Sequence, residues 1–126
     1  METDEINAYI KAHGYAMKTT GSGLRFMYLK ENAGGEKIIN GMEITLIFKV
    51  WLLDGTLCYD SEVSGKKKFI VGADHLETGI HEAVQLMHKG EKAMVILPSH
   101  LAFGLIGDRK KIPPKSAVVY SLEIEN

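Results

Sequence analysis

Two of the five histidines and the single cysteine are the first candidates for metal binding or nucleophilic attack. His81 and His88 lie seven residues apart in a segment with helical periodicity, so they could share one face of a helix. No carboxylate or cysteine stands beside them at the spacing of a metal motif, so no metal site is predicted. Cys58 has no activating base near it in the sequence, and a small buried thiol is the better interpretation.

The short motifs of the common enzyme classes are missing from this sequence. It contains no Gly-x-Ser-x-Gly, no P-loop, no Gly-x-Gly-x-x-Gly that opens a helix, no HExxH and no Cys-x-x-Cys. Hydrolytic and redox catalysis are therefore poorly supported, and no cofactor is predicted.

The remaining candidates are aromatic and aliphatic residues near the ends of predicted strands, with a short acidic segment among them. Taken singly, each is more easily explained as core, because alternating apolar residues of a sheet usually face a helix. Taken together, they could line a pocket built from loops on a rigid scaffold. These residues are Phe48, the Tyr59-Asp60-Ser61 segment, Phe69, Leu76, Glu77, Ile80, Phe103 and Ile112.

Strands must position most of these side chains. Residues 43–53 have an apolar side chain at every second position, and Asp54-Gly55 after them predicts a hairpin. The same alternation predicts strands over residues 91–97 and 118–124. Shorter strands are expected over residues 23–31, 56–59 and 66–72.

Two segments have the periodicity of helices. Residues 76–88 place Leu76, Ile80, Ala83, Val84 and Met87 on one face, and Gly90 follows. Near the start of the chain, Thr3 is the expected cap of a short amphipathic helix, whose apolar face comprises Ile6, Tyr9 and Ile10. The order of elements predicts an α+β fold, a twisted antiparallel β-sheet wrapping one α-helix, with an N-terminal helical arm. We expect residues 1–40 to be a helix and strand extension and residues 41–126 to be the main domain.

Composition excludes several classes of function. The chain has 126 residues, 45% of them hydrophobic and 25% charged, with a formal net charge of -1, as expected for one globular domain. It lacks the basic excess of nucleic-acid-binding proteins, and no apolar run approaches the length of a membrane span. The acidic start is unlike a signal peptide, so the expected location is the cytoplasm, or the bacterial periplasm or outer membrane as a lipoprotein if a leader was removed.

The prolines of this chain lie in its last third, where Ile112, Pro113 and Pro114 precede the final strand. Proline keeps the residue before it extended, so this step either stiffens the entry to a strand or holds a pocket wall. Together with LDGTLCYDS, FIVG and GIHEAVQLMHKGEKAMVILPSHLAFG, the segment KIPPKSAVVYSLEI resembles the FKBP-type peptidyl-prolyl cis-trans isomerases over residues 41–125. The N-terminal helix is most similar to the gliding-motility-associated or lipoprotein-like bacterial branch of that family.

The resemblance implies a cofactor-free enzyme that accelerates rotation about X-Pro bonds of unfolded or maturing proteins. Resonance holds the amide planar and gives a barrier of about 20 kcal/mol. The planar form is the more polar one, so a dry apolar pocket favours the twisted form and no nucleophile is required. Proline-containing polypeptides are the implied partners, together with the macrolide inhibitors of the family.

The resemblance also implies a role for each matching position. An aromatic wall is expected from Tyr59 and Phe69, and aliphatic walls from Leu76 and Ile112, while Asp60 is the expected buried carboxylate at the rim. Tyr120 matches the aromatic of the last strand. The positions of His75 and Glu77 contact ligands through the main chain, so their side chains are not expected to matter.

Three positions depart from the family pattern. Phe48 and Phe103 stand where the family usually has tyrosine, and Ile80 stands where a tryptophan commonly forms the floor. A lost neutral hydrogen bond costs about 0.5 to 1.5 kcal/mol, so a weakened enzyme and reduced macrolide affinity are expected. Two other interpretations stay open: a non-catalytic peptide-binding or chaperone-like module on the same fold, and a plain core. Catalysis is preferred because the pocket positions remain apolar.

Overall fold

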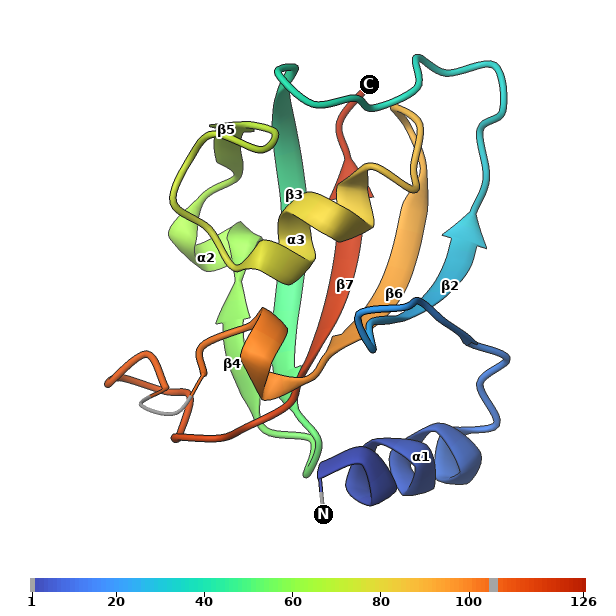
Figure 1. Cartoon of the computed structure of the whole chain (residues 1–126). Helices are drawn as coiled ribbons and strands as arrows, with labels where there is room; N and C mark the ends of the chain where they lie inside the picture. The colour runs from blue at the N-terminus through green and yellow to red at the C-terminus, as the bar shows by residue number, and fades with distance from the viewer. Residues whose placement is uncertain (1, 105–106) are drawn as a thin grey trace.

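A computed structural model describes residues 2–104 and 107–126 of the chain. Its strands form one antiparallel sheet in the order β1-β2-β6-β7-β3-β4, and β5 also pairs with β3. The strands are β1 (Lys18–Thr19), β2 (Arg25–Lys30), β3 (Glu43–Leu52), β4 (Leu57–Asp60), β5 (Lys67–Ile70), β6 (Lys92–Leu97) and β7 (Val118–Ile124). Figure 1 shows β3, β7 and β6 side by side behind a single crossing helix.

The long strand β3 pairs with three other strands, β7 along one edge and β5 and β4 along the other. One edge pairs along its length with β7, from Leu46 opposite Ile124 to Leu52 opposite Val118. The other edge pairs first with β5, where Leu46 lies opposite Lys67, and then with β4, where Val50 lies opposite Tyr59. Between β4 and β5 the chain leaves the sheet through the short helix α2 (Ser61–Ser64).

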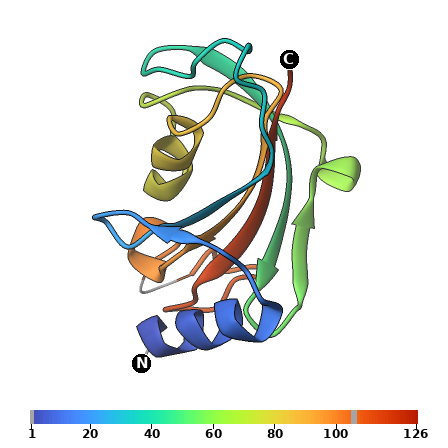
Figure 2. The same ribbon diagram turned by 90° about the vertical axis from the view of Figure 1, so that its right-hand side faces the viewer.

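Helix α3 (Thr78–Val84) crosses the concave face of the sheet and closes the main core, as Figure 2 shows in profile. Its buried residues Ile80, Ala83 and Val84 pack on inward-facing side chains of β3, β6 and β7. Gly79 permits this close approach, since a Cβ there would lie 2.5 Å from a methyl carbon of Leu97. The helix therefore lies close against the sheet, and the predicted α+β architecture is confirmed.

The N-terminal helix α1 (Glu2–His13) packs on the opposite face of the sheet. Ile6 is 1% exposed and contacts a second, smaller apolar cluster that includes Ile96 and Val119. These strand residues face away from α3 because neighbouring positions of a strand point to opposite sides. The amphipathic face predicted from the sequence thus docks on the sheet.

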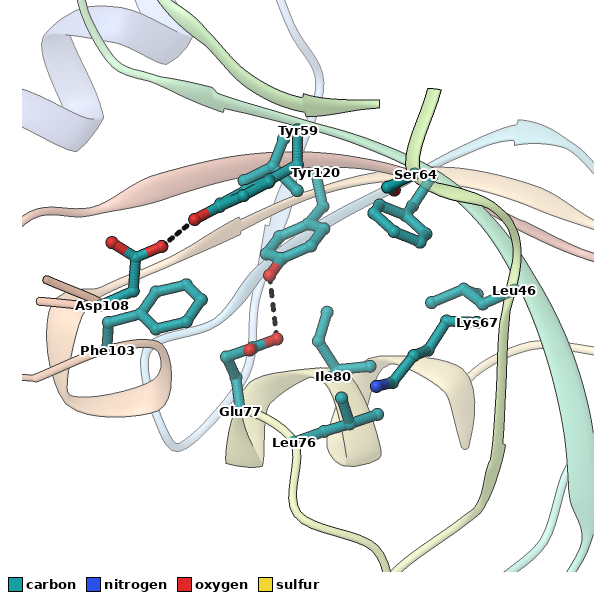
Figure 3. A pocket seen from close by; sticks show the side chains of 12 residues that line it. Leu46, Tyr59, Ser64, Lys67, Leu76, Glu77, Ile80, Phe103, Asp108 and Tyr120 are labelled. Atoms are coloured by element: carbon teal, nitrogen blue, oxygen red, sulfur yellow. Dashed lines mark hydrogen bonds between the residues drawn. The ribbon is translucent and has the colours of Figure 1, made fainter. Parts of the chain in front are cut away.

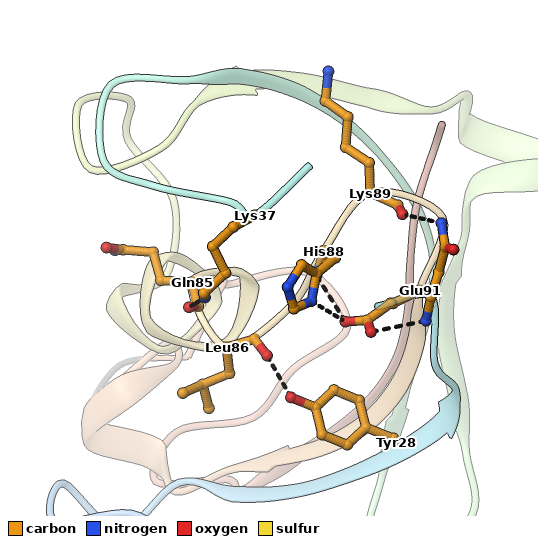
Figure 4. Close-up of polar contacts among 8 residues, drawn as sticks. Tyr28, Lys37, Gln85, Leu86, His88, Lys89 and Glu91 are labelled. Carbon is orange, nitrogen blue, oxygen red and sulfur yellow. Dashed lines mark hydrogen bonds and ion pairs between the residues drawn. The ribbon is translucent and has the colours of Figure 1, made fainter. Parts of the chain in front are cut away.

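A buried carboxylate joins the end of the α3 segment to the connector before β3. Glu91 is 2% exposed, and one of its oxygens accepts a hydrogen bond from the main-chain N–H group of His88 at 2.7 Å, as Figure 4 shows. The other oxygen accepts from the main-chain N–H group of Asn32 at 2.9 Å. Burial opposes ionisation of Glu91, but these hydrogen bonds outweigh it and hold its pKa below the usual range. The network fixes both connections at the same edge of the molecule.

Three details differ from the sequence predictions. Helix α1 begins at Glu2, so Thr3 lies inside it rather than at its cap. Helix α3 ends at Val84, before the predicted end, although Met87 is still fully buried. Strand β2 pairs with β6 and contributes Phe26 to the main core, so the strand of the proposed extension is part of the common sheet. The domain division at residue 40 stays a proposal.

The chain also contains a short 3-10 turn, η1 (Ser99–Leu101), at the start of the long connection between β6 and β7. This connection includes the Ile-Pro-Pro step. It passes close to Gly79 of α3, because a Cβ added to Gly79 would lie 3.0 Å from the carbonyl oxygen of Leu101. Across residues 2–104 and 107–126, no helix is both long and apolar enough to cross a bilayer.

Candidate functional site

An apolar pocket opens between the concave face of the sheet, the start of α3 and the connection after β6. Its cavity volume is about 230 Å³. We call it the apolar pocket; it is lined by Leu46, Phe48, Val50, Tyr59, Ser64, Lys67, Leu76, Glu77, Ile80, Phe103, Asp108 and Tyr120. Figure 3 shows how these side chains converge from the strands, the helix and the loop.

The predicted site residues are mostly brought together here. Alternation along β3 turns Phe48 toward the cavity, and Tyr120 reaches it from the adjacent strand β7. Ile80 comes from the first turn of α3 and is almost completely buried at the base. Of the residues expected at the site, Phe48, Tyr59, Leu76, Glu77, Ile80, Phe103 and Tyr120 line the pocket.

The side chain of Glu77 lines the apolar pocket. The sequence predicts only main-chain contacts with a ligand at this position. The residue precedes the first turn of α3 but makes no side-chain cap. Instead, the Tyr120 hydroxyl donates a hydrogen bond of 2.8 Å to Glu77 Oε2 (Figure 3). Burial raises the pKa of Glu77, although the hydroxyl partly offsets this effect. Burial and the neighbouring carboxylate raise the pKa of Tyr120 well above its ordinary value.

Asp108, which was not predicted from the sequence, forms a second phenol–carboxylate pair at the pocket. The Tyr59 hydroxyl donates to Asp108 Oδ2, and Oδ1 accepts from the main-chain N–H groups of Lys110, Lys111 and Ile112 at 2.8 to 3.0 Å. Burial opposes ionisation of Asp108, but these donors outweigh it and lower the pKa. Burial, followed by the bond to this carboxylate, raises the pKa of Tyr59 to about 12. Asp108 thus fixes the loop and orients the ring of Tyr59.

Phe69 does not line the pocket, contrary to the prediction of an aromatic wall. It is 2% exposed and lies in the main core, where its ring meets His81 edge to face with centroids 5.6 Å apart. Lys67 lies two residues earlier on the same face of β5 and pairs with Leu46 of β3. It lines the apolar pocket, whereas Phe69 does not. The alternation of KKKFIVG places both side chains on one face, but only the register decides which reaches the cavity.

Asp60 and Ile112 also lie outside the lining. Asp60 Oδ1 caps α2 by accepting from the Glu62 main-chain N–H at 2.9 Å, and Lys49 Nζ lies 3.9 Å from Oδ2. Asp60 therefore has a main-chain donor and a basic neighbour on β3, and it caps α2 instead of lining the apolar pocket. Ile112 is 2% exposed and packs in the core behind the loop. Their roles at the site stay predictions that no pocket contact supports.

The histidines of the α3 segment have separate structural partners. His81 Nδ1 accepts from the Gly72 main-chain N–H at 2.8 Å, and Nε2 lies 2.8 Å from the Asp74 carbonyl oxygen. His88 Nδ1 faces Glu91 at 3.4 Å. Among the described residues, no group of three or more His, Cys, Asp or Glu side chains is placed to hold a metal ion. Burial raises the pKa of the Cys58 thiol, which disfavours its reactive thiolate.

A curved antiparallel sheet around one helix, with an apolar pocket at the start of that helix, defines the class of the protein. The family model for FKBP-type peptidyl-prolyl cis-trans isomerases matches residues 34–125. The chain belongs to this family.

Curated relatives include proteins from two bacteria. A Haemophilus influenzae protein described as a probable FKBP-type peptidyl-prolyl cis-trans isomerase is 30% identical over 123 residues, which cover 98% of this chain and 50% of that protein. The Neisseria meningitidis serogroup C FK506-binding protein is 28% identical over 92 residues, 71% of this chain and 84% of that protein. The chain thus spans about half the length of the Haemophilus relative. The branch of the family stays a prediction.

Solved structures confirm the fold. The crystal structure of FkpA from Escherichia coli matches with a TM-score of 0.85 at 24% identity and covers 99% of this chain and 58% of that one. The crystal structure of AtFKBP13 matches with a TM-score of 0.81 at 22% identity and covers 89% and 98% of the two chains. Both likenesses concern the fold alone.

Proposed function

We propose that this chain catalyses cis-trans isomerisation of X-Pro bonds in unfolded or maturing polypeptides. The observation that carries the proposal is the apolar pocket, a cavity of about 230 Å³ with Phe48, Leu76, Ile80 and Phe103 in its lining. Such a space is suited to a proline ring and to the exclusion of water from the adjacent amide.

Desolvation supplies the catalysis in this proposal. Resonance across the planar amide produces a rotation barrier of about 20 kcal/mol, and the planar state carries the larger charge separation. Water stabilises that polar state, so transfer into an apolar site favours the twisted amide relative to it. The main chain of Glu77 lies at the start of α3, where the N–H groups have no intrahelical partner and can hold the client's carbonyl oxygen.

A non-catalytic peptide-binding or chaperone-like module is the second candidate. It draws support from the scarcity of free hydroxyl donors around the cavity. The hydroxyls of Tyr59 and Tyr120 already donate to Asp108 and Glu77, and Phe48 and Phe103 have none. A client bound here would receive few hydrogen bonds from side chains. Its apolar groups would still be buried, but its X-Pro bond would be oriented less precisely.

Macrolides of the FK506 type are proposed ligands of the same pocket. The proposal rests on family membership and on the name of the Neisseria relative. Reduced affinity is expected because Ile80 offers less surface than an indole and Phe103 offers no hydroxyl. At roughly 25 cal/mol per Å², the loss of some tens of Å² of contact costs about 1 kcal/mol.

A protease-coupled assay on a Leu-Pro peptide tests the proposal. We expect the rate of cis-to-trans conversion to rise in proportion to protein concentration. A rate equal to the uncatalysed one at high protein concentration, combined with saturable binding of the same peptide, would favour the binding module instead.

A further inference from the structure

Charged side chains divide the apolar pocket into two unequal sides. The carboxylates of Glu77 and Asp108 lie on one side with the ring of Phe103 beside them, and Lys67 lies on the opposite side, as Figure 3 shows. Two carboxyl groups and one ammonium group give the lining a formal net negative charge. This pattern is unexpected in a site whose proposed role is to remove water from a neutral amide.

The two carboxylates differ in how far their charge is already satisfied. Asp108 receives four hydrogen bonds, from the Tyr59 hydroxyl and three main-chain N–H groups. Glu77 receives one from another residue, from Tyr120 to Oε2. Among residues 2–104 and 107–126, no lysine, arginine or histidine forms an ion pair with Glu77.

The second oxygen of Glu77 accepts no hydrogen bond from another described residue. No buried side-chain oxygen or nitrogen of the described residues lacks a hydrogen-bond partner. The Glu77 side chain lines the apolar pocket, and its carboxylate keeps capacity to accept further hydrogen bonds there. Since both tyrosine hydroxyls are committed to carboxylates, this side of the pocket offers an acceptor and a negative charge to a client.

We propose that Glu77 makes the pocket selective for clients with a lysine or arginine beside the proline. This inference rests on the proposed function of the same pocket. A carboxylate without an ion-pair partner attracts an ammonium or guanidinium group and repels a carboxylate. Lys67, on the far side, opposes the basic client and so limits the preference.

Three peptides that differ at one position test this selectivity. Lysine, norleucine and glutamate are placed in turn immediately before proline, and a second series places them immediately after it. Norleucine keeps the aliphatic stem of lysine without its charge. In one of the series at low salt, we expect kcat/KM for lysine to exceed that for norleucine by roughly three- to tenfold, with glutamate lowest. The preference is expected to shrink as salt is added.

Three variants assign the preference to its source. Glu77→Gln is expected to bring the lysine-to-norleucine ratio to about one, whatever happens to the absolute rate. Lys67→Gln is expected to increase the ratio, and it provides an independent reading if the Glu77 variant does not fold. Glu43→Gln removes an exposed carboxylate outside the pocket, which pairs with Lys68 at 3.6 Å, and is expected to leave the ratio unchanged.

A ratio of one in both series for the wild type, or an unchanged ratio in Glu77→Gln, would overturn the inference. If no peptide is turned over, the proposed catalysis fails separately. The dissociation constants of the same peptides, measured by NMR titration, then decide the selectivity by the same ratio.

Discussion

At the residue scale, the hydroxyl groups around the pocket distinguish this protein from the family pattern. The hydroxyls of Tyr59 and Tyr120 donate hydrogen bonds to the carboxylates of Asp108 and Glu77. Phe103 lines the cavity with an unsubstituted ring. The pocket thus keeps its apolar surface while offering few side-chain donors, and restoring one donor should measurably change ligand binding.

Phe103→Tyr is the direct substitution at this scale. The new hydroxyl would be available to a ligand carbonyl oxygen, and such a bond contributes about 1 kcal/mol, so macrolide affinity is expected to rise roughly fivefold. Isothermal titration of both proteins with the same macrolide measures the change. Unchanged affinity in a folded variant would show that position 103 does not face the bound ligand.

At the element scale, the connections matter as much as the strands. The loop after β6 is held by Asp108, and the two chain segments at the other end of α3 are held by Glu91. Helix α1 covers the outer face of the sheet without contributing to the pocket lining. The elements therefore separate into those that shape the site and those that support the sheet.

Glu91→Gln tests the carboxylate that joins Asn32 to His88. An amide has one acceptor oxygen, so one buried N–H loses its partner, and the free energy of unfolding is expected to fall by about 1 to 3 kcal/mol at pH 7. The pKa of Glu91 is lower in the folded chain than the ordinary value of 4.5. The stabilisation is therefore complete above that value and is lost as pH falls through the folded pKa.

Urea unfolding at neutral and acidic pH measures both effects. Glu36→Gln is the matched control, since Glu36 is an exposed carboxylate that pairs with Lys89 at 3.3 Å in the same region. Its effect is expected to stay within about 0.5 kcal/mol. Equal effects of the two substitutions would contradict the role given to Glu91.

Ile6→Ala tests the contribution of α1. Ile6 is 1% exposed and packs against Ile96 and Val119. Truncation of a buried isoleucine to alanine lowers the free energy of unfolding by about 2 to 5 kcal/mol. We expect lower thermal stability with kcat/KM unchanged at temperatures where the protein stays folded. Lys11→Ala, on the exposed side of the same helix, serves as the control. A selective loss of activity in folded Ile6→Ala would show that α1 shapes the pocket.

At the scale of the whole molecule, local patterns predicted the fold better than they predicted the pocket lining. Alternation along residues 43–53 and 118–124 correctly predicted β3 and β7, because side-chain direction in a strand repeats every two residues. The placement of Phe69 and Lys67 depended on the register between β5 and β3, which is a property of two distant segments.

Contacts between distant segments also explain the residues that the sequence did not reveal. Tyr59 and Asp108 are far apart in the chain, and the path of the long loop alone brings them together. The Ile-Pro-Pro step allowed either a stiff entry to a strand or a pocket wall, and it could not show that Ile112 is buried in the core. Likewise, the side chain of Glu77 enters the pocket because Tyr120 of β7 lies across from the start of α3.

The central claim is that the apolar pocket accelerates prolyl isomerisation, and NMR exchange spectroscopy on a Leu-Pro peptide tests it most directly. Wild-type protein in catalytic amounts is expected to produce cis-trans exchange far faster than the spontaneous process, which takes tens to hundreds of seconds. Phe103→Ala removes a ring from the pocket lining and is expected to lower kcat/KM by roughly tenfold while the fold is kept. Spontaneous exchange rates in the presence of the wild type, or equal catalysis by both proteins, would contradict the claim.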